Sequence, residues 1–152
     1  MSEATLSEVE DPLALEGQVC FALSVAARSV VAVYRPLLEP LGLTHPQYLV
    51  MLAMWEHEPL SVSALGRLLQ LDPATLSPLL KRLEAAGLLR RERSRHDERS
   101  LALVLTDRGQ KLRAQAETIP STIVEKLGME VSELRALHHQ LSQVIAAAVA
   151  VV

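Results

Sequence analysis

Residues 61–106 constrain the fold of this chain more than any other stretch, because two helical segments there are followed by two segments of strand length. Ser61 and Asp72 can each cap the free amides in the first turn of a helix, and Pro73 suits the first helical position, which needs no amide. Gly87 is expected to end the second helix in a left-handed conformation. That helix carries four leucines at helical spacing, which predict one buried stripe: Leu76, Leu79, Leu80 and Leu83.

Beyond Gly87 the spacing changes from that of a helix to that of a strand. Residues 88–94 and 101–106 have strand length, and leucines alternate with smaller residues in the second segment. The residues between them, 95–100, are polar and charged and too few for a helix. Two short helices followed by a charged hairpin make a winged helix-turn-helix, and this arrangement predicts a DNA-binding module.

The formal net charge of −3 seems to argue against a DNA-binding protein until it is divided along the chain. Residues 81–99 carry seven basic and four acidic side chains, a local charge of +3, which leaves −6 on the rest of the chain. Phosphate binding depends on the local field, so a basic patch on an acidic body is sufficient. A solvated charged hairpin is the alternative, and the capped helix pair before it favours DNA.

Side chains that lie off the leucine stripe are the candidates for contact with DNA. Thr75, Ser77 and Pro78 fall near the start of the second helix, and we expect them to contact base edges or the groove wall. Four basic residues are expected to bind phosphates, which positions the protein without reading sequence: Lys81, Arg82, Arg90 and Arg93. For any single arginine, an ordinary surface charge is an equally good interpretation.

Helical spacing continues on both sides of this module. A long helix is expected to begin near Pro12 and to run to about residue 38, and it is apolar around much of its circumference. Further helices are expected over about 107–150, with a bend or break at Ile119–Pro120. We expect these terminal helices to bury each other and a second copy of the chain, so that the protein is a homodimer. Residues 1–11 lack apolar periodicity and are expected to form a flexible arm.

The predicted organisation is a single domain of residues 12–152, mainly α with a small β-wing, plus terminal dimerisation helices at about 12–38 and 107–150. The winged helix-turn-helix is expected to occupy about 46–106. Its first helix should run from about Pro46 to His57 and place four side chains in the core: Leu49, Leu52, Ala53 and Trp55.

Several functional classes lack their sequence signals. The chain shows no metal-ligand spacing, phosphate-binding loop, dinucleotide-binding turn or catalytic triad, so we expect neither an enzyme nor a bound metal or cofactor. No apolar run is judged long enough to cross a bilayer, and the alanine- and valine-rich C-terminal helix has no basic face for a membrane surface. The single cysteine fits a reducing compartment, so a cytoplasmic location is expected.

Two sets of local motifs carry a family resemblance. The central set comprises residues 71–76, 80–84, 87–88, 97–100 and 105–106. These motifs resemble the MarR family of dimeric winged-helix regulators. The N-terminal set comprises residues 19–23, 34–38 and 46–49. It is similar to the branch that regulates resistance to organic hydroperoxides (OhrR), and together the two sets span nearly the whole chain.

This resemblance implies a repressor controlled by peroxide. In the branch, the reduced dimer binds a near-palindromic operator, and an organic hydroperoxide oxidises an N-terminal cysteine, which releases the DNA. Cys20 matches the reactive position, and Tyr34 matches a tyrosine that hydrogen-bonds the cysteine sulfur. By the same resemblance, Arg99 is the wing arginine that enters the minor groove, with Asp97 bracing the tip.

Two departures concern the cysteine's surroundings. The family often has tyrosines where this chain has Ser24 and His45. Ser24 lies one turn from Cys20, so a hydroxyl contact is possible, and an imidazolium at His45 would favour the thiolate if it faced Cys20. Because there is no second cysteine, oxidised Cys20 is expected to join a small cellular thiol, to form another reversible adduct or to over-oxidise.

Other interpretations stay open at this point. A lone cysteine on an apolar helical stripe is more often a small core residue than a sensor. A MarR-type repressor released by a small aromatic or phenolic ligand, with Cys20 inert, is therefore the main alternative. A thiol peroxidase is disfavoured by the missing resolving cysteine, and a simple dimerisation adaptor is disfavoured by the basic wing.

Overall fold

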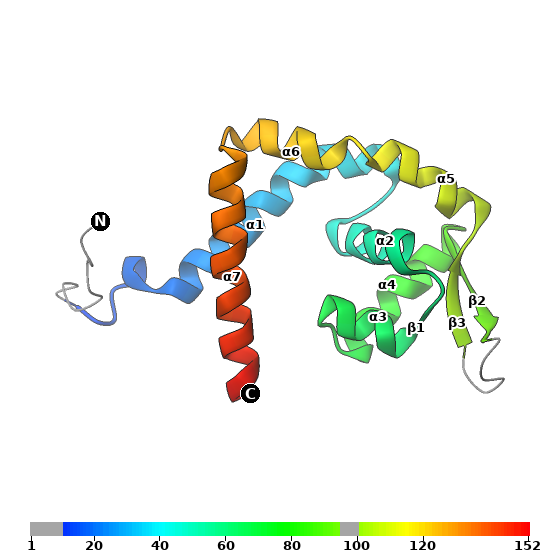
Figure 1. The fold of residues 1–152 in the computed structure, drawn as a ribbon, viewed down its shortest axis with the longest axis horizontal. Coiled ribbons are helices and arrows are strands. Elements are labelled where there is room, and N and C mark those ends of the chain that lie inside the picture. Colours follow the sequence, from blue (N-terminus) through cyan, green and yellow to red (C-terminus); the bar gives the residue numbers. More distant parts are fainter. Residues whose placement is uncertain (1–10, 95–100) are drawn as a thin grey trace.

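The computed structural model describes residues 11–94 and 101–152, which are mostly helical with one small antiparallel sheet (Figure 1). The central lobe contains α2, α3, α4 and the sheet, whereas α5 and α6 lead away from it and α7 descends from the end of α6. The elements in chain order are η2 (Leu15–Gly17), α1 (Val19–Leu38), η3 (Glu39–Leu41), α2 (His45–His57), β1 (Leu60–Ser61), α3 (Val62–Leu69), α4 (Pro73–Ala85), β2 (Leu89–Arg93), β3 (Leu101–Leu105), α5 (Asp107–Ala116), α6 (Ile119–Leu127) and α7 (Val131–Val151).

Side-chain caps begin the helices of the central lobe, as the sequence predicted. The Ser61 hydroxyl accepts the Ala64 amide hydrogen at the start of α3, and the Asp72 carboxylate accepts that of Thr75 at 2.7 Å at the start of α4. After α4, Gly87 has a φ of 75°, the left-handed conformation that turns the chain toward β2. The helix-turn-helix and its boundaries are therefore set by local sequence.

The core lies between α2, α4 and the sheet. All four leucines of the predicted stripe on α4 are buried, together with Met51 and Met54 of α2. The prediction that Leu49 and Leu52 fill the core is wrong, since they are 36% and 39% exposed. Helix α2 is apolar around most of its circumference, and its buried face is the one that carries Met51 and Met54. Of the other two predicted core residues, Ala53 is buried and Trp55 is half-buried.

The wing is a three-stranded sheet in the order β1-β3-β2. Both predicted strands are confirmed, whereas β1 was missed because two residues give no periodicity. Arg91 lies opposite Leu103 in the antiparallel pair of β2 and β3. The Glu58 carboxylate accepts the backbone amide hydrogen of Leu105 at 2.7 Å, which joins the end of α2 to the sheet. Asp97 and Arg99 lie outside the described residues.

Helix α1 begins at Val19, so the predicted start near Pro12 is wrong. Gln18 is extended, and its side-chain amide donates to the carbonyls of Pro12 and Ala14, which holds the preceding residues in a local turn. The predicted break at Ile119–Pro120 is confirmed, because α6 begins there.

The prediction that the terminal helices bury each other holds for α6, which packs against α1 and buries Ile119 and Ile123, but not for α7 within one chain. No residue of α7 is buried, and Leu38 is the one buried residue of α1. Large apolar side chains are exposed on both helices, among them Phe21, Val25, Val144 and Ile145. The segment Val19–Leu41 also has the length and apolar composition of a membrane span, contrary to the expectation from sequence. An apolar helix that packs against protein passes the same test, so composition does not decide between lipid and a partner.

Gly109 of α5 lies against the backbone that follows α4, and this contact generates a stability prediction. A Cβ at this position would lie 2.2 Å from the Leu88 carbonyl oxygen, which is backbone and held by the Thr106 amide. Alanine gains about 1 kcal/mol in helix propensity, but the overlap costs more. We expect Gly109→Ala to lower the free energy of unfolding by about 2 kcal/mol in urea titrations. Lys111→Ala, at an exposed position of the same helix, is the control, and equal stability of both variants would contradict the packing argument.

Candidate DNA interface and redox site

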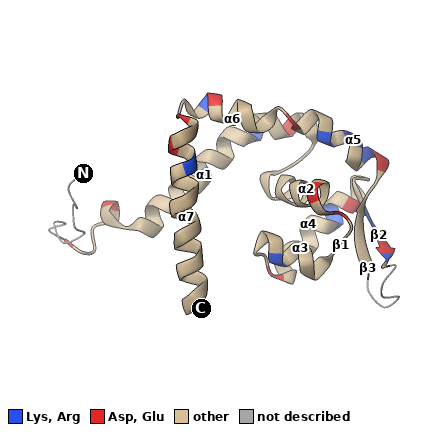
Figure 2. Ribbon diagram, in the orientation of Figure 1, with Lys and Arg blue, Asp and Glu red and all other residues tan. Residues whose placement is uncertain are grey.

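The outer face of α4 presents most of the predicted DNA contacts. Thr75, Pro78, Lys81 and Arg82 are exposed and lie on the side opposite the leucine stripe. Ser77 is half-buried beside that stripe, so it is less accessible than its neighbours. Basic residues of α4 and β2 lie near one another in the central lobe (Figure 2). The helix can therefore present two small side chains and two cations to a duplex.

The wing arginines differ in their partners and their directions. Alternation along β2 places Arg90 and Arg93 on opposite faces of the strand, so these predicted phosphate ligands do not point the same way. Arg90 is paired with Glu92, with its Nη2 at 2.7 Å from the carboxylate. Arg91, which the sequence did not single out, is paired with Glu84 of α4, with Nε at 2.6 Å from Oε1.

Cys20 does not lie beside Tyr34 in a single chain. Cys20 is a free, exposed thiol in the first turn of α1, not a small core residue. Ser24 is exposed one turn further along the same helix. Tyr34 follows Cys20 by fourteen positions on α1, a distance of about 21 Å along a helix axis. A contact between Cys20 and Tyr34 therefore requires a second chain.

Three rings cluster where α1 meets α2. The rings of Tyr34 and His45 are 4.9 Å apart between centroids in an edge-to-face arrangement, and that of Tyr48 lies 5.9 Å from Tyr34 and 6.2 Å from His45. The sequence did not single out Tyr48, although it follows His45 by three positions and so shares its helical face. Tyr34 and His45 are thus brought together as one site, with Tyr48 beneath them at 3% exposure.

Burial shifts the acid–base behaviour of this ring cluster. It lowers the pKa of His45 and raises the pKa of both Tyr34 and Tyr48, because each charged form loses solvation. The uncharged forms of all three side chains are thereby favoured near neutral pH. Burial works against the imidazolium on which the thiolate hypothesis for His45 depends.

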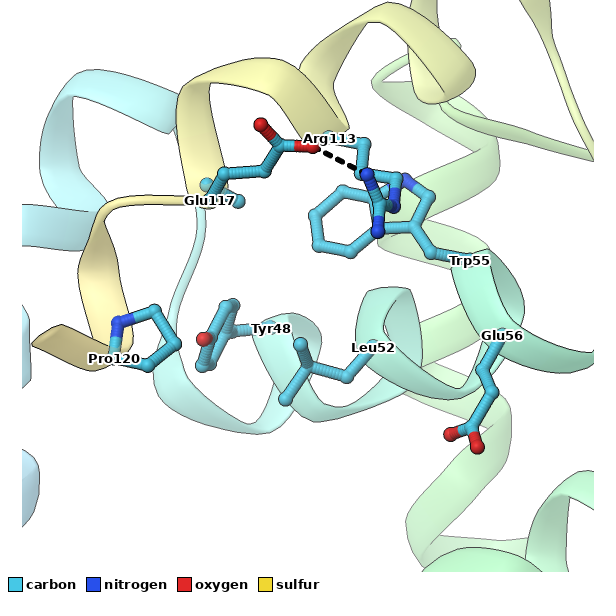
Figure 3. Close-up of a pocket in the computed structure, with 8 residues that line it drawn as sticks. Tyr48, Leu52, Trp55, Glu56, Arg113, Glu117 and Pro120 are labelled. Carbon is cyan, nitrogen blue, oxygen red and sulfur yellow. Dashed lines mark hydrogen bonds and ion pairs between the residues drawn. The ribbon is translucent and has the colours of Figure 1, made fainter.

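A cavity of about 400 Å³ opens beside the ring cluster, between α2 and the α5–α6 bend (Figure 3). Its walls include the Tyr48 ring, Leu52 and the Trp55 indole, and Arg113 lies at its edge in an ion pair with Glu117. The indole Nε1 donates to the Gly109 carbonyl at 2.9 Å, which fixes the ring's orientation. Leu52, wrongly predicted to be core, is a wall of this cavity.

Comparison with known proteins identifies the family. The MarR family model matches residues 43–101. The organic hydroperoxide resistance transcriptional regulator of Bacillus subtilis (strain 168) is 41% identical over 138 residues, covering 89% of this chain and 94% of that protein. The chain belongs to the MarR family. A second relative, the HTH-type transcriptional regulator TtmR of Methylorubrum extorquens (strain PA1), is 47% identical over 133 residues, which are 88% of this chain and 68% of TtmR.

Solved structures agree with this assignment and include a complex with DNA. Reduced AbfR bound to DNA matches with a TM-score of 0.72 and 35% identity, covering 89% of this chain and 94% of that one. AbfR of Staphylococcus epidermidis has also been solved in overoxidized and disulfide forms. The MarR family consists of transcription regulators, and this chain is a winged-helix regulator of MarR type.

The lowered pKa of His45 generates a prediction for stability against pH. In the unfolded chain, His45 is protonated near the ordinary histidine pKa of about 6.5, whereas in the folded chain it is protonated only at a lower pH. Acidification below about 6.5 therefore favours unfolding. Stability contributed by neutral His45 is present above this window and lost as the pH falls through it. We expect His45→Gln to show a smaller loss of stability than the wild type between pH 7.5 and 5.5 in urea titrations. His138→Gln, outside the ring cluster, is the control, and an unchanged pH dependence in His45→Gln would refute the assignment.

Proposed function

We propose that this chain is a homodimeric repressor that binds a near-palindromic operator and releases it when an organic hydroperoxide oxidises Cys20. The observation that carries the proposal is the exposed thiol on an apolar helix whose matching tyrosine lies too far away to reach it in the same chain. A relative named as the organic hydroperoxide resistance transcriptional regulator, and AbfR structures in several oxidation states, support it.

The exposed terminal helices supply the surface for the second copy. Helix α1 leaves Phe21 and Val25 exposed, and α7 carries no charged residue after Arg135 (Figure 2). Arg28 on α1 would be costly to place in lipid, whereas it can reach the rim of a protein interface. An antiparallel crossing of two α1 helices would bring Cys20 of one subunit to Tyr34 and His45 of the other, with Ser24 one turn away.

At such a site the chemistry is a two-electron oxidation of sulfur. The Cys20 thiolate attacks the terminal oxygen of the hydroperoxide, the O–O bond breaks, and an alkoxide leaves, taking a proton to become the alcohol. The sulfenic acid then condenses with a small thiol, which forms a mixed disulfide and releases water. The Tyr34 hydroxyl and neutral His45 are suited to hydrogen-bond the thiolate and the departing oxygen. The bulkier sulfur adduct would no longer fit between the helices, so the spacing of the two winged lobes changes.

The peroxide response is tested with the single cysteine. We expect cumene hydroperoxide together with a small thiol such as glutathione to dissociate wild-type protein from its operator in a mobility-shift assay, and excess dithiothreitol to restore binding by reducing the mixed disulfide. Cys20→Ser should stay bound at the same peroxide concentration, because its hydroxyl is not oxidised. Ser29→Ala, on the same helix but without a proposed role, is the control. Release of Cys20→Ser at the wild-type peroxide concentration would refute the redox proposal.

The cavity between α2 and α5 supports a second candidate, release by a small aromatic or phenolic ligand. Tyr48 and Trp55 offer aromatic walls, and Arg113 can exchange Glu117 for a ligand carboxylate. Trp55 is the single tryptophan, so binding is read directly from its fluorescence.

We expect a hydroxybenzoate to quench Trp55 fluorescence and to release DNA from both wild type and Cys20→Ser if this candidate holds. Arg113→Ala should weaken the quenching by about tenfold, because the carboxylate loses a charge-assisted hydrogen bond. Quenching without DNA release would leave the cavity as a binding site with no regulatory role, and no quenching would remove the candidate.

A further inference from the structure

An ion pair joins α4 to the wing. Glu84 lies in the last turn of α4, and its Oε1 accepts a hydrogen bond from Arg91 Nε of β2 at 2.6 Å. The side chains are 28% and 33% exposed, so the pair is partly shielded from solvent. A carboxylate near a helix C-terminus is opposed by the helix dipole, and Arg91 offsets that cost. The contact therefore links two elements that are both expected to touch DNA.

The direction of Arg91 follows from strand alternation. Leu89 is buried, and Arg91 lies on the same face of β2, which turns its side chain toward the central lobe and the end of α4. On the other side of the junction, α5 holds the chain through Thr106 and Arg108, whose side chains donate to the carbonyls of Gly87 and Ala86. The base of the wing is thus tied on one side by backbone carbonyls and on the other by Glu84.

We propose that Glu84 is a positioning residue for DNA binding, whose ion pair with Arg91 fixes the wing at the angle to α4 that lets both contact one duplex. The proposal rests on the assignment of α4 and the wing to the DNA interface, and not on the peroxide response. Glu84 is negatively charged, so DNA phosphates would repel it and it would not bind them directly. Its contribution comes through Arg91, which is held back from the DNA and braces the strand.

The pair formed by Arg90 and Glu92 is a matched control in the same strand. It is also a glutamate–arginine contact, at 2.7 Å, but both residues belong to β2 and are 57% and 48% exposed. It joins no second element, and Glu92 competes with phosphate for an arginine expected to bind DNA. The two glutamates thus carry the same charge and each pairs with an arginine of β2, but the pairs lie on opposite faces of the strand and differ in what they connect.

The test compares Glu84→Gln with Glu92→Gln in operator affinity. Each variant removes one negative charge near the DNA, so the long-range field alone would tighten binding in both. We expect Glu92→Gln to bind about threefold more tightly and Glu84→Gln about tenfold more weakly, since the latter loses the wing's alignment. Hydroxyl-radical footprints should show that Glu84→Gln keeps backbone protection at the centre of each half-site, where α4 would lie, and loses it at the flanks where the wing would lie.

Charge reversal separates positioning from a general loss of structure. We expect the double variant Glu84→Arg with Arg91→Glu to restore affinity to within about threefold of the wild type, because the bridge is re-formed in the opposite sense. Operator binding by Glu84→Gln that equals or exceeds wild type overturns the proposal, as does a double variant no better than Glu84→Gln. Failure of the wild-type protein to bind any operator would instead refute the DNA-binding assignment itself.

Discussion

The junction between α5 and the end of α4 is the constraint on which the rest of the structure depends. The absence of a side chain at Gly109 lets α5 approach the Leu88 carbonyl, and Thr106 then both caps α5 and bonds the chain leaving α4. The Trp55 indole bonds the Gly109 carbonyl, which ties α2 to the same point. Contacts at this junction therefore connect α5, which leads to α6 and α7, with three other parts of the chain: α4, the wing and the wall of the cavity. A displacement of the terminal helices would reach the DNA-binding lobe through this junction.

Local signals explain why the central lobe could be predicted from sequence. Ser61, Asp72 and Thr106 act within three residues of their own positions, so each cap is visible without knowledge of the fold. The wrong predictions in this lobe concern side chains whose burial depends on contacts with residues far away in the sequence. Leu49 and Leu52 belong to a helix that is apolar on several faces, and only packing against α4 and the sheet selects the buried one.

In the candidate site too, local sequence predicted some features, whereas others depend on the fold. The positions of Cys20, Tyr34 and His45 were found through family resemblance, yet their separation along α1 and the meeting of Tyr34 with His45 depend on how the chain folds back through η3. Tyr48 belongs to the motif of residues 46–49, but its place in the ring cluster was missed because it depends on the fold, and the cavity has no sequence signature of its own. Arg91 was missed because its value lies in a partner seven positions earlier on another element.

The proposed homodimer would account both for the exposed apolar faces of α1 and α7 and for the separation of Cys20 from the ring cluster. In a single chain, α1 and α7 leave large apolar side chains in water, and Cys20 is far from the ring cluster that would stabilise it. In the proposed homodimer, a second copy would remove both costs at once, since it would cover the apolar surface and bring the ring cluster of one subunit to the thiol of the other. A sensor built between subunits has a further advantage over one within a subunit. Under the proposed function, any group added to the Cys20 sulfur would have to fit within the subunit interface, so oxidation would act directly on the spacing of the two DNA-binding lobes.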